Sequence, residues 1–312
     1  MTRGLLTAAG ICWIFCGTAR ANDAAAETVA GGIVLKEERR VSMRKERLRI
    51  SEVAGKYKVS VEYEFVNESK DDVTTEIAFP VPPYTFMFDD VGGPRNLGKF
   101  RAWVNGKAIP VERQLRAVVN GKDYALLLRQ LGINIEDHGG CDMARGDDFT
   151  GLSARQLKRL KQLGVVEDAS YACGVEAKWA VDITWHWTQH FPPGKVVRIR
   201  HEYTPSVGFQ GLYLGEGVPA DLPADACFDP AVMKSLVDPV DGCHVESWVK
   251  YILTTANTWK TPISDFELLV EHPANRHVSF CWDGKVEAIN ATTARAAAKD
   301  FVPKHELTVY FF

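Results

Sequence analysis

Histidine and glutamate residues in two neighbouring segments are of types that could together bind a metal ion. The candidate ligands are His186, His190, His201 and Glu202. His186 and His190 lie four residues apart in an alternating segment, so a strand there would place both on one face. Imidazole nitrogens and a carboxylate suit zinc or a similar ion, and such a site predicts an exported metal-dependent hydrolase. The alternative interpretation is that the tryptophans of this segment face the core and the histidines lie on a solvated face.

The sequence contains few of the residue patterns that support nucleophilic catalysis by cysteine or serine. His138 lies three residues before Cys141, and an imidazole beside a thiol could support nucleophilic catalysis. A disulfide between Cys141 and Cys173 explains the same cysteine without catalysis. The chain has no Gly-x-Ser-x-Gly, no Cys-x-x-Cys and no glycine-rich phosphate loop. These absences favour a binding or accessory protein over an enzyme, and we expect no cofactor.

An aromatic segment follows a group of prolines and could form a binding patch. Within residues 80–90, the aromatic side chains are Tyr84, Phe86 and Phe88. If exposed, they would provide apolar anchors for a partner. Soluble monomers rarely expose such patches, which favours the alternative that these side chains pack in the core.

The first 21 residues have the pattern of a secretory signal peptide. Arg3 provides the positive start, residues 5–15 are apolar, and Ala19-Arg20-Ala21 forms a small-x-small cleavage site. A membrane anchor is the alternative, but a spanning helix needs roughly 20 apolar residues. We therefore predict cleavage after Ala21, a mature chain that begins at Asn22 without a transmembrane segment, and a periplasmic or secreted location.

The composition is that of a mildly acidic globular protein. The 40 acidic residues outnumber the 37 basic ones, and 46% of the chain is hydrophobic. An acidic balance argues against nucleic acid as the partner. Together with export, it favours a protein or glycan of the cell envelope as partner.

Five of the seven cysteines follow the predicted cleavage site, and an oxidising compartment would allow two disulfides. We predict Cys141–Cys173 and Cys227–Cys243, because each pair closes a modest loop around a helical excursion. This arrangement leaves Cys281 as a free thiol. The main alternative joins Cys227 to Cys281 and leaves Cys243 unpaired.

Alternation of apolar and polar residues, typical of half-buried strands, recurs along the chain. It is clearest in segments 57–65, 73–79, 180–189 and 197–203. Asn105-Gly106 lies between two short apolar segments and predicts a hairpin with a type I′ turn. Asp123 and Ser153 can each cap a short helix that ends at a glycine.

These elements predict a mainly β protein with short helices. We expect two β-sandwich-like domains, which cover residues 22–205 and 206–312. The first carries an α-rich insertion at about residues 112–176.

Several short motifs, in order along the chain, resemble a bacterial exported family of unknown function. They include Asn22-Asp23, Tyr63 to Asn67, Ala78-Phe79-Pro80, Trp185 to Pro192, His201 to Gly208 and Ser279-Phe280-Cys281. The resemblance implies a β-rich periplasmic or secreted protein and supplies no catalytic residues. The sequence thus predicts an exported, non-catalytic binding or accessory module of the cell envelope.

Overall fold

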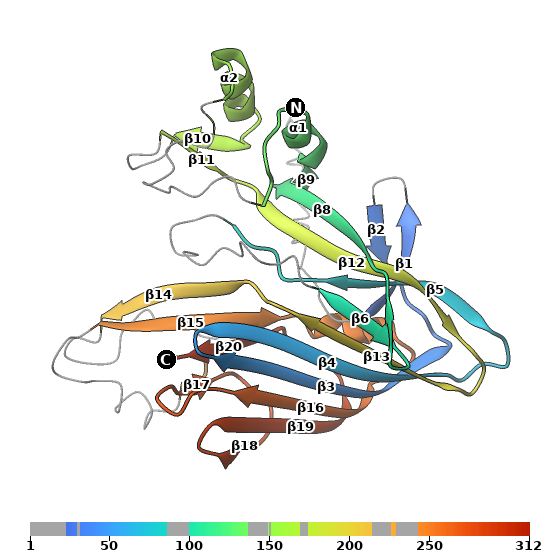
Figure 1. The fold of residues 1–312 in the computed structure, drawn as a ribbon. Coiled ribbons are helices and arrows are strands. Elements are labelled where there is room, and N and C mark those ends of the chain that lie inside the picture. Colours follow the sequence, from blue (N-terminus) through green and yellow to red (C-terminus); the bar gives the residue numbers. More distant parts are fainter. Residues whose placement is uncertain are drawn as a thin grey trace, which may run out of the picture.

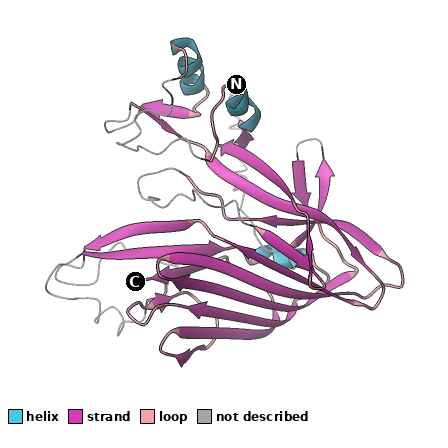
Figure 2. Cartoon of the chain, in the orientation of Figure 1, coloured by secondary structure: helices cyan, strands magenta, loops and turns pink. Residues whose placement is uncertain are grey.

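The computed structural model describes most of the chain. The described residues are 23–29, 32–85, 100–136, 149, 151–168, 174–213, 226–228 and 243–312. The predicted signal peptide, 1–21, lies outside them. The fold is mainly β, with several multistranded sheets and two short α-helices in the described parts, which confirms the predicted fold class (Figures 1 and 2). No helix among these residues has the length and apolar character needed to span a bilayer.

The largest sheet has eight strands in the order β18-β19-β16-β3-β4-β13-β6-β7. Its strands are β3 (Val41–Val53), β4 (Lys56–Asn67), β6 (Arg101–Val104), β7 (Lys107–Ile109), β13 (Val196–Tyr203), β16 (Ile263–Glu271), β18 (Val286–Asn290) and β19 (Thr293–Phe301). All neighbours are antiparallel except β3 and β16, which are parallel. The predicted hairpin joins β6 to β7, and Asn105 and Gly106 have the positive φ angles of 49° and 79° that a type I′ turn requires.

A six-stranded sheet, β2-β1-β5-β12-β8-β9, packs on the inner face of the large sheet. Its strands are β1 (Ala24–Val29), β2 (Gly32–Leu35), β5 (Val73–Pro80), β8 (Glu112–Val119), β9 (Lys122–Asp123) and β12 (Ala180–Phe191). Aromatic rings join the two layers: Phe65 of β4 lies 5.8 Å from Phe191 of β12. Phe79 of β5 lies 5.5 Å from Tyr203 of β13. Because side chains alternate along each strand, these aromatic residues are buried on the sides of the two sheets that face each other.

A four-stranded sheet, β14-β15-β20-β17, extends the inner layer. Its strands are β14 (Val207–Tyr213), β15 (Cys243–Tyr251), β17 (Val278–Ser279) and β20 (Leu307–Phe311), and the 3₁₀ helix η1 (Thr254–Thr258) follows β15. Tyr57 of β4 packs on Phe311 at 5.3 Å, and its hydroxyl lies 2.6 Å from that of Ser247. The four-stranded sheet therefore shares the hydrophobic core of the large sheet.

Strands from both sides of the predicted domain boundary share the eight-stranded sheet. β16 lies after residue 205, yet it pairs along its length with β3. The predicted division into 22–205 and 206–312 therefore does not separate one sheet from another.

The two α-helices of the described residues both fall within the predicted insertion. They are α1 (Ala125–Gln130) and α2 (Ala154–Gln162), beside a hairpin of β10 (Val166–Asp168) and β11 (Val175–Ala177). Ser153 caps α2 as predicted, in a reciprocal capping box with Gln156. Tyr124 is the N-cap residue of α1, and Asp123 accepts a hydrogen bond from the backbone N–H of Ala125 at 2.9 Å. The first residues of the insertion, however, form β8, which pairs with β12 in the six-stranded sheet.

A disulfide links Cys227 to Cys281, with the Cα atoms 5.0 Å apart. The predicted Cys227–Cys243 pair and the free thiol at Cys281 are therefore wrong. Loop length was a poor guide because residues 226–228 lie beside β17, far away in sequence. The Ser279 hydroxyl donates to the carbonyls of Ala226 and Cys227, at 2.7 and 3.0 Å, and so holds this segment next to Cys281. Cys141 and Cys173 lie outside the described residues.

Candidate functional site

The two histidines of β12 lie on the solvent side of the six-stranded sheet. His186 Nδ1 lies 2.7 Å from Glu76 Oε1. His190 Nε2 lies 2.9 Å from Asp72 Oδ1. Each of these histidines thus has its own carboxylate partner, on β5 or just before it.

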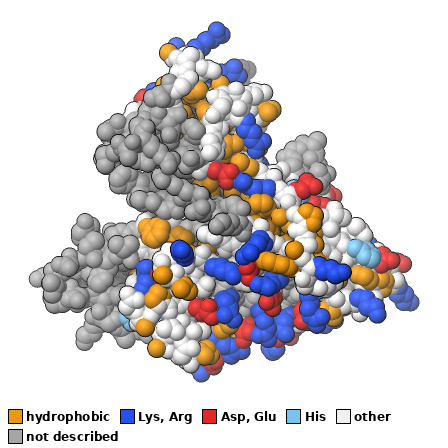
Figure 3. Space-filling model, in the orientation of Figure 1, with side chains coloured by type: hydrophobic (Ala, Val, Ile, Leu, Met, Phe, Trp, Pro, Cys, Tyr) orange, Lys and Arg blue, Asp and Glu red, His pale blue; other side chains and the backbone are white. Residues whose placement is uncertain are grey.

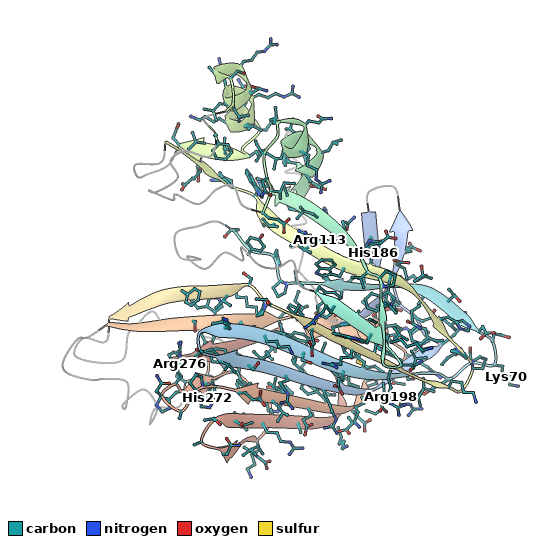
Figure 4. The ribbon with its side chains drawn as sticks, in the orientation of Figure 1. Lys70, Arg113, His186, Arg198, His272 and Arg276 are labelled. Carbon is teal, nitrogen blue, oxygen red and sulfur yellow. A yellow bond between two sulfur atoms is a disulfide. The ribbon has the colours of Figure 1, made fainter. Side chains whose placement is uncertain are left out.

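The other two predicted ligands lie on β13, in the large sheet, and face opposite ways. His201 is fully buried on the inner face. Glu202 faces outward and forms ion pairs with Lys58 at 3.1 Å and with Arg101 at 3.0 Å. Burial opposes ionisation of Glu202, but the hydrogen bonds from Lys58 and Arg200 outweigh it and lower its pKa. Figure 4 labels His186 and Arg198, a neighbour of these residues on β13, and shows them on separate sheets.

The predicted metal ligands therefore do not converge. Across the described parts of the chain, no group of three or more His, Cys, Asp or Glu side chains is arranged to hold a metal ion. Strand alternation correctly indicated that His186 and His190 share a face. It carried no information on which sheet each strand joins.

Of the predicted aromatic patch, only Tyr84 lies among the described residues. It is 5% exposed, and its backbone pairs with that of Val181. Tyr84 is therefore part of the core. Phe86 and Phe88 lie outside the described residues, as do His138 and Cys141.

The outer face of the eight-stranded sheet carries a groove of about 350 Å³, a volume typical of small-ligand sites. We call it the outer groove. Its lining residues are Lys45, Arg47, Glu62, Tyr63, Glu64, Trp103, Gly106, Arg198, Ile199 and Arg200. The side chains that alternate outward come from four adjacent strands, β3, β4, β13 and β6. Figure 3 shows the mixed basic and acidic surface of this sheet.

Strand register arranges these side chains in two rows across the sheet. One row runs Arg47, Glu62, Arg200 and Trp103, and the next runs Lys45, Glu64 and Arg198. Strands lie about 4.8 Å apart, so direct cross-strand neighbours are within reach of one another. Arg198 pairs with Glu64 at 3.2 Å, and Arg200 pairs with Glu62 at 3.9 Å.

Trp103 is the distinctive residue of the outer groove. Its indole ring lies 4.8 Å from the guanidinium carbon of Arg200 and 5.6 Å from that of Arg101. Both distances are within the range of cation–π attraction. The two arginines hold the ring at the surface, where it provides a flat apolar area beside charged groups.

The outer groove has an excess of positive charge. Four basic side chains line it against two acidic ones. Guanidinium groups bind carboxylate and phosphate groups with two parallel hydrogen bonds, and these arginines keep 45% to 66% of their side chains exposed. The arrangement can bind an anion beside an apolar ring.

The sequence prediction missed this site. The alternation of Glu62 and Glu64 with apolar residues was visible, and so was the hairpin that carries Trp103. Trp103 lies next to Arg200 across the sheet because β6 pairs with β13, which comes almost 100 residues later in the chain.

Comparisons with solved structures find remote similarity. A Legionella pneumophila protein described as a candidate nutrient-binding protein matches with a TM-score of 0.47 and 15% identity, over 94% of this chain and 70% of that one. The M1 zinc metallopeptidase of Deinococcus radiodurans matches with a TM-score of 0.30 and 12% identity, over 88% and 43%. Yeast LTA4 hydrolase matches with a TM-score of 0.31 and 9% identity, over 88% and 29%. The chain thus spans less than half the length of the two hydrolases.

No curated protein sequence matches the chain with significant similarity. A family model described as a domain of unknown function, DUF4424, matches residues 21–310. The match covers nearly the whole chain, and the protein therefore belongs to the DUF4424 family.

Proposed function

We propose that this protein is an exported, non-catalytic binding module of the bacterial cell envelope, and that the outer groove binds an acidic glycan. The observation that carries the proposal is the combination of Trp103 with Arg198 and Arg200 in one groove. The signal-peptide pattern of residues 1–21 supports export. The first test of location is the N-terminal sequence of the protein from cell envelopes, which we expect to begin at Asn22.

The position of the groove favours a glycan over a peptide. The strands that carry its basic residues, β3, β4 and β13, are paired on both sides, so their backbone groups are used within the sheet. A peptide could not add to them as a further strand. Recognition must come from side chains, and a sugar polymer with carboxylates offers both anionic groups and apolar ring faces to such a surface.

The metal-dependent hydrolase is less well supported. Its predicted ligands lie on two sheets, and His201 faces the interior between the sheets while Glu202 lies on the opposite face of β13, covered by Lys58 and Arg101. Moving them into one coordination sphere would require β12 and β13 to change sheets.

Calorimetric titration of the mature protein with uronate-containing oligosaccharides, and with neutral oligosaccharides of equal length, tests the proposed function. We expect binding of the acidic series alone, weakened by salt because screening reduces the attraction between exposed charges. Trp103→Ala, or Arg198→Gln with Arg200→Gln, should weaken binding about tenfold or more, which corresponds to about 1.4 kcal/mol.

Arg295→Gln is the matched control. Arg295 lies on β19, pairs with Glu267 at 2.8 Å and does not line the outer groove. Its removal should leave the affinity unchanged. Equal binding of neutral sugars, or unchanged affinity in the Trp103 and arginine variants, would reject the outer groove as the site.

A further inference from the structure

A cluster of basic side chains surrounds the carboxylate of Glu202, next to the outer groove. The side chain of Glu202 is only 8% exposed, and it forms ion pairs with Lys58 at 3.1 Å, with Arg101 at 3.0 Å and with Arg200. The three basic side chains cover it and are themselves 45% to 65% exposed. We call Lys58 and Arg101 the basic pair. Unlike Arg200, they do not line the outer groove.

The cluster has more positive than negative charge. Among the described residues, Lys58 and Arg101 have no carboxylate partner other than Glu202. A single carboxylate cannot neutralise three cations, so the surface around it attracts a further anion. An ammonium group has three N–H donors and a guanidinium group has five, which leaves donors of the basic pair available to such an anion.

Strand pairing places the basic pair at a defined distance from Arg198. In the pairing of β13 with β6, Glu202 lies across from Arg101, and Arg200 lies across from Trp103. Side chains on one face of a strand recur about every 6.7 Å, so the positions of Arg198 and Glu202 are about 13 Å apart. Trp103 therefore lies midway between two basic sites.

The acidic side chains of the sheet indicate the direction in which an anionic chain would lie. Across the sheet, from β13 to β3, such a chain would pass over Glu62 and Glu64 of β4, which are 62% and 32% exposed. Along β13 the one acidic residue is Glu202, and the basic side chains cover it. An anionic chain is therefore repelled less along β13 than across the sheet.

We infer that the basic pair is a second anion subsite, and that the ligand is a glycan chain that lies along β13 with acidic groups on both sides of Trp103. The inference rests on the proposed function and deepens it, because it requires a polymer with repeated carboxylates rather than a single acidic sugar. One sugar ring contacts the Trp103 indole. One carboxylate pairs with Arg198, and another, about 13 Å along the chain, pairs with Lys58 and Arg101.

Two subsites on one chain predict that affinity increases with ligand length. Once one carboxylate is bound, the other is held near its own subsite, so its binding is an intramolecular step. A uronate hexasaccharide offers carboxylates to both subsites, whereas a methyl uronoside has one carboxylate and can occupy only one.

The test measures the Kd of both ligands, by calorimetry for the hexasaccharide and by NMR titration for the methyl uronoside. The proteins are the native mature chain and the double variant Lys58→Gln with Arg101→Gln. We expect the variant to bind the hexasaccharide about tenfold more weakly, because two charge-assisted contacts are lost. It should bind the methyl uronoside as the native protein does, which also shows that the outer groove remains folded.

A matched control removes the same charge elsewhere on the sheet. Arg295→Gln with Lys299→Gln takes two positive charges from β19, where both side chains pair with acids of β16 at 2.8 Å. This variant should keep the native affinity for the hexasaccharide. Lys58→Arg with Arg101→Lys retains both charges of the basic pair and should also bind the hexasaccharide with nearly native affinity.

The outcomes separate the second subsite from the proposed function. Native affinity for the hexasaccharide in the Lys58→Gln, Arg101→Gln variant would overturn the second subsite. So would an equal loss in the β19 control, or an equal loss for the methyl uronoside. The proposed function fails instead if the native protein binds no acidic oligosaccharide, or if Trp103→Ala keeps the full affinity.

Discussion

At the scale of single residues, His201 shows how the interior sets the chemistry of a side chain. Aromatic rings surround its imidazole, with centroid distances of 5.0 Å to Phe79, 5.1 Å to Phe100, 5.2 Å to Trp187 and 5.6 Å to Tyr63. This environment disfavours the charged form and lowers the pKa from 6.5 to about 3.

Acid should therefore destabilise the protein through His201. Between pH 6.5 and 3 the unfolded chain binds a proton at this residue that the folded chain does not, so the stabilising contribution is complete above pH 6.5 and decreases as the pH falls. The raised pKa of Asp23 acts in the opposite direction. The folded chain keeps the Asp23 proton at pH values where the unfolded chain has lost it, so this contribution to stability decreases as the pH rises.

Denaturant unfolding at pH 7.5 and 5.0 measures this effect. We expect the native sequence to lose about 2 kcal/mol more than His201→Phe between these two pH values, since each pKa unit corresponds to about 1.4 kcal/mol. His190→Gln, which removes a half-exposed histidine, is the control and should follow the native sequence. Identical losses in the native and His201→Phe proteins would contradict the assignment.

At the scale of elements, the β14–β15 pair depends on one glycine. Gly208 lies directly across from Trp248 in the register of the two strands. A Cβ atom built on Gly208 would lie 2.0 Å from an indole carbon of Trp248. The absence of a side chain at Gly208 is what allows the indole to lie against the strand.

Gly208→Ala should therefore displace Trp248 and destabilise the protein by about 1–3 kcal/mol. Gly151→Ala is the matched control, because a Cβ atom there meets nothing within 4 Å and its φ angle is not positive. Chemical denaturation of both variants provides the comparison. A Gly208→Ala protein as stable as Gly151→Ala would show that the strand pair adapts without cost.

At the scale of the whole molecule, links that are distant in sequence close the fold. The parallel pairing of β3 with β16 joins strands about 220 residues apart, and Arg47 of β3 pairs across it with Glu267. The Cys227–Cys281 disulfide adds a covalent link over 54 residues, beside the four-stranded sheet. These connections tie segments from both halves of the chain into one set of sheets.

Removal of the disulfide should destabilise the protein without changing its fold. We expect Cys227→Ser with Cys281→Ser to lose about 2–4 kcal/mol of unfolding free energy, mainly because the unfolded chain gains freedom. Peptide mapping of the non-reduced native protein should find Cys227 joined to Cys281. A Cys227–Cys243 peptide, or unchanged stability in the double variant, would contradict this prediction.

Local features of the fold could be predicted from the sequence. The period of two in residues 57–65 predicted β4, Asn105-Gly106 predicted the turn between β6 and β7, and Ser153 predicted the start of α2. Each of these depends on residues within a few positions of one another, since side-chain alternation, positive φ angles and helix caps are local properties.

Only the tertiary structure decided which strands are neighbours, and the candidate site depends on that. Many strands with the same alternation could pair in many orders, because alternation specifies a face and not a partner. The placement of Trp103 beside Arg200, of Cys281 beside Cys227 and of Asp23 beside His201 follows from packing between sheets and from long-range pairing. The sequence therefore determined the β character and the alternating faces, and the contacts between distant strands created the outer groove and the buried environment of His201.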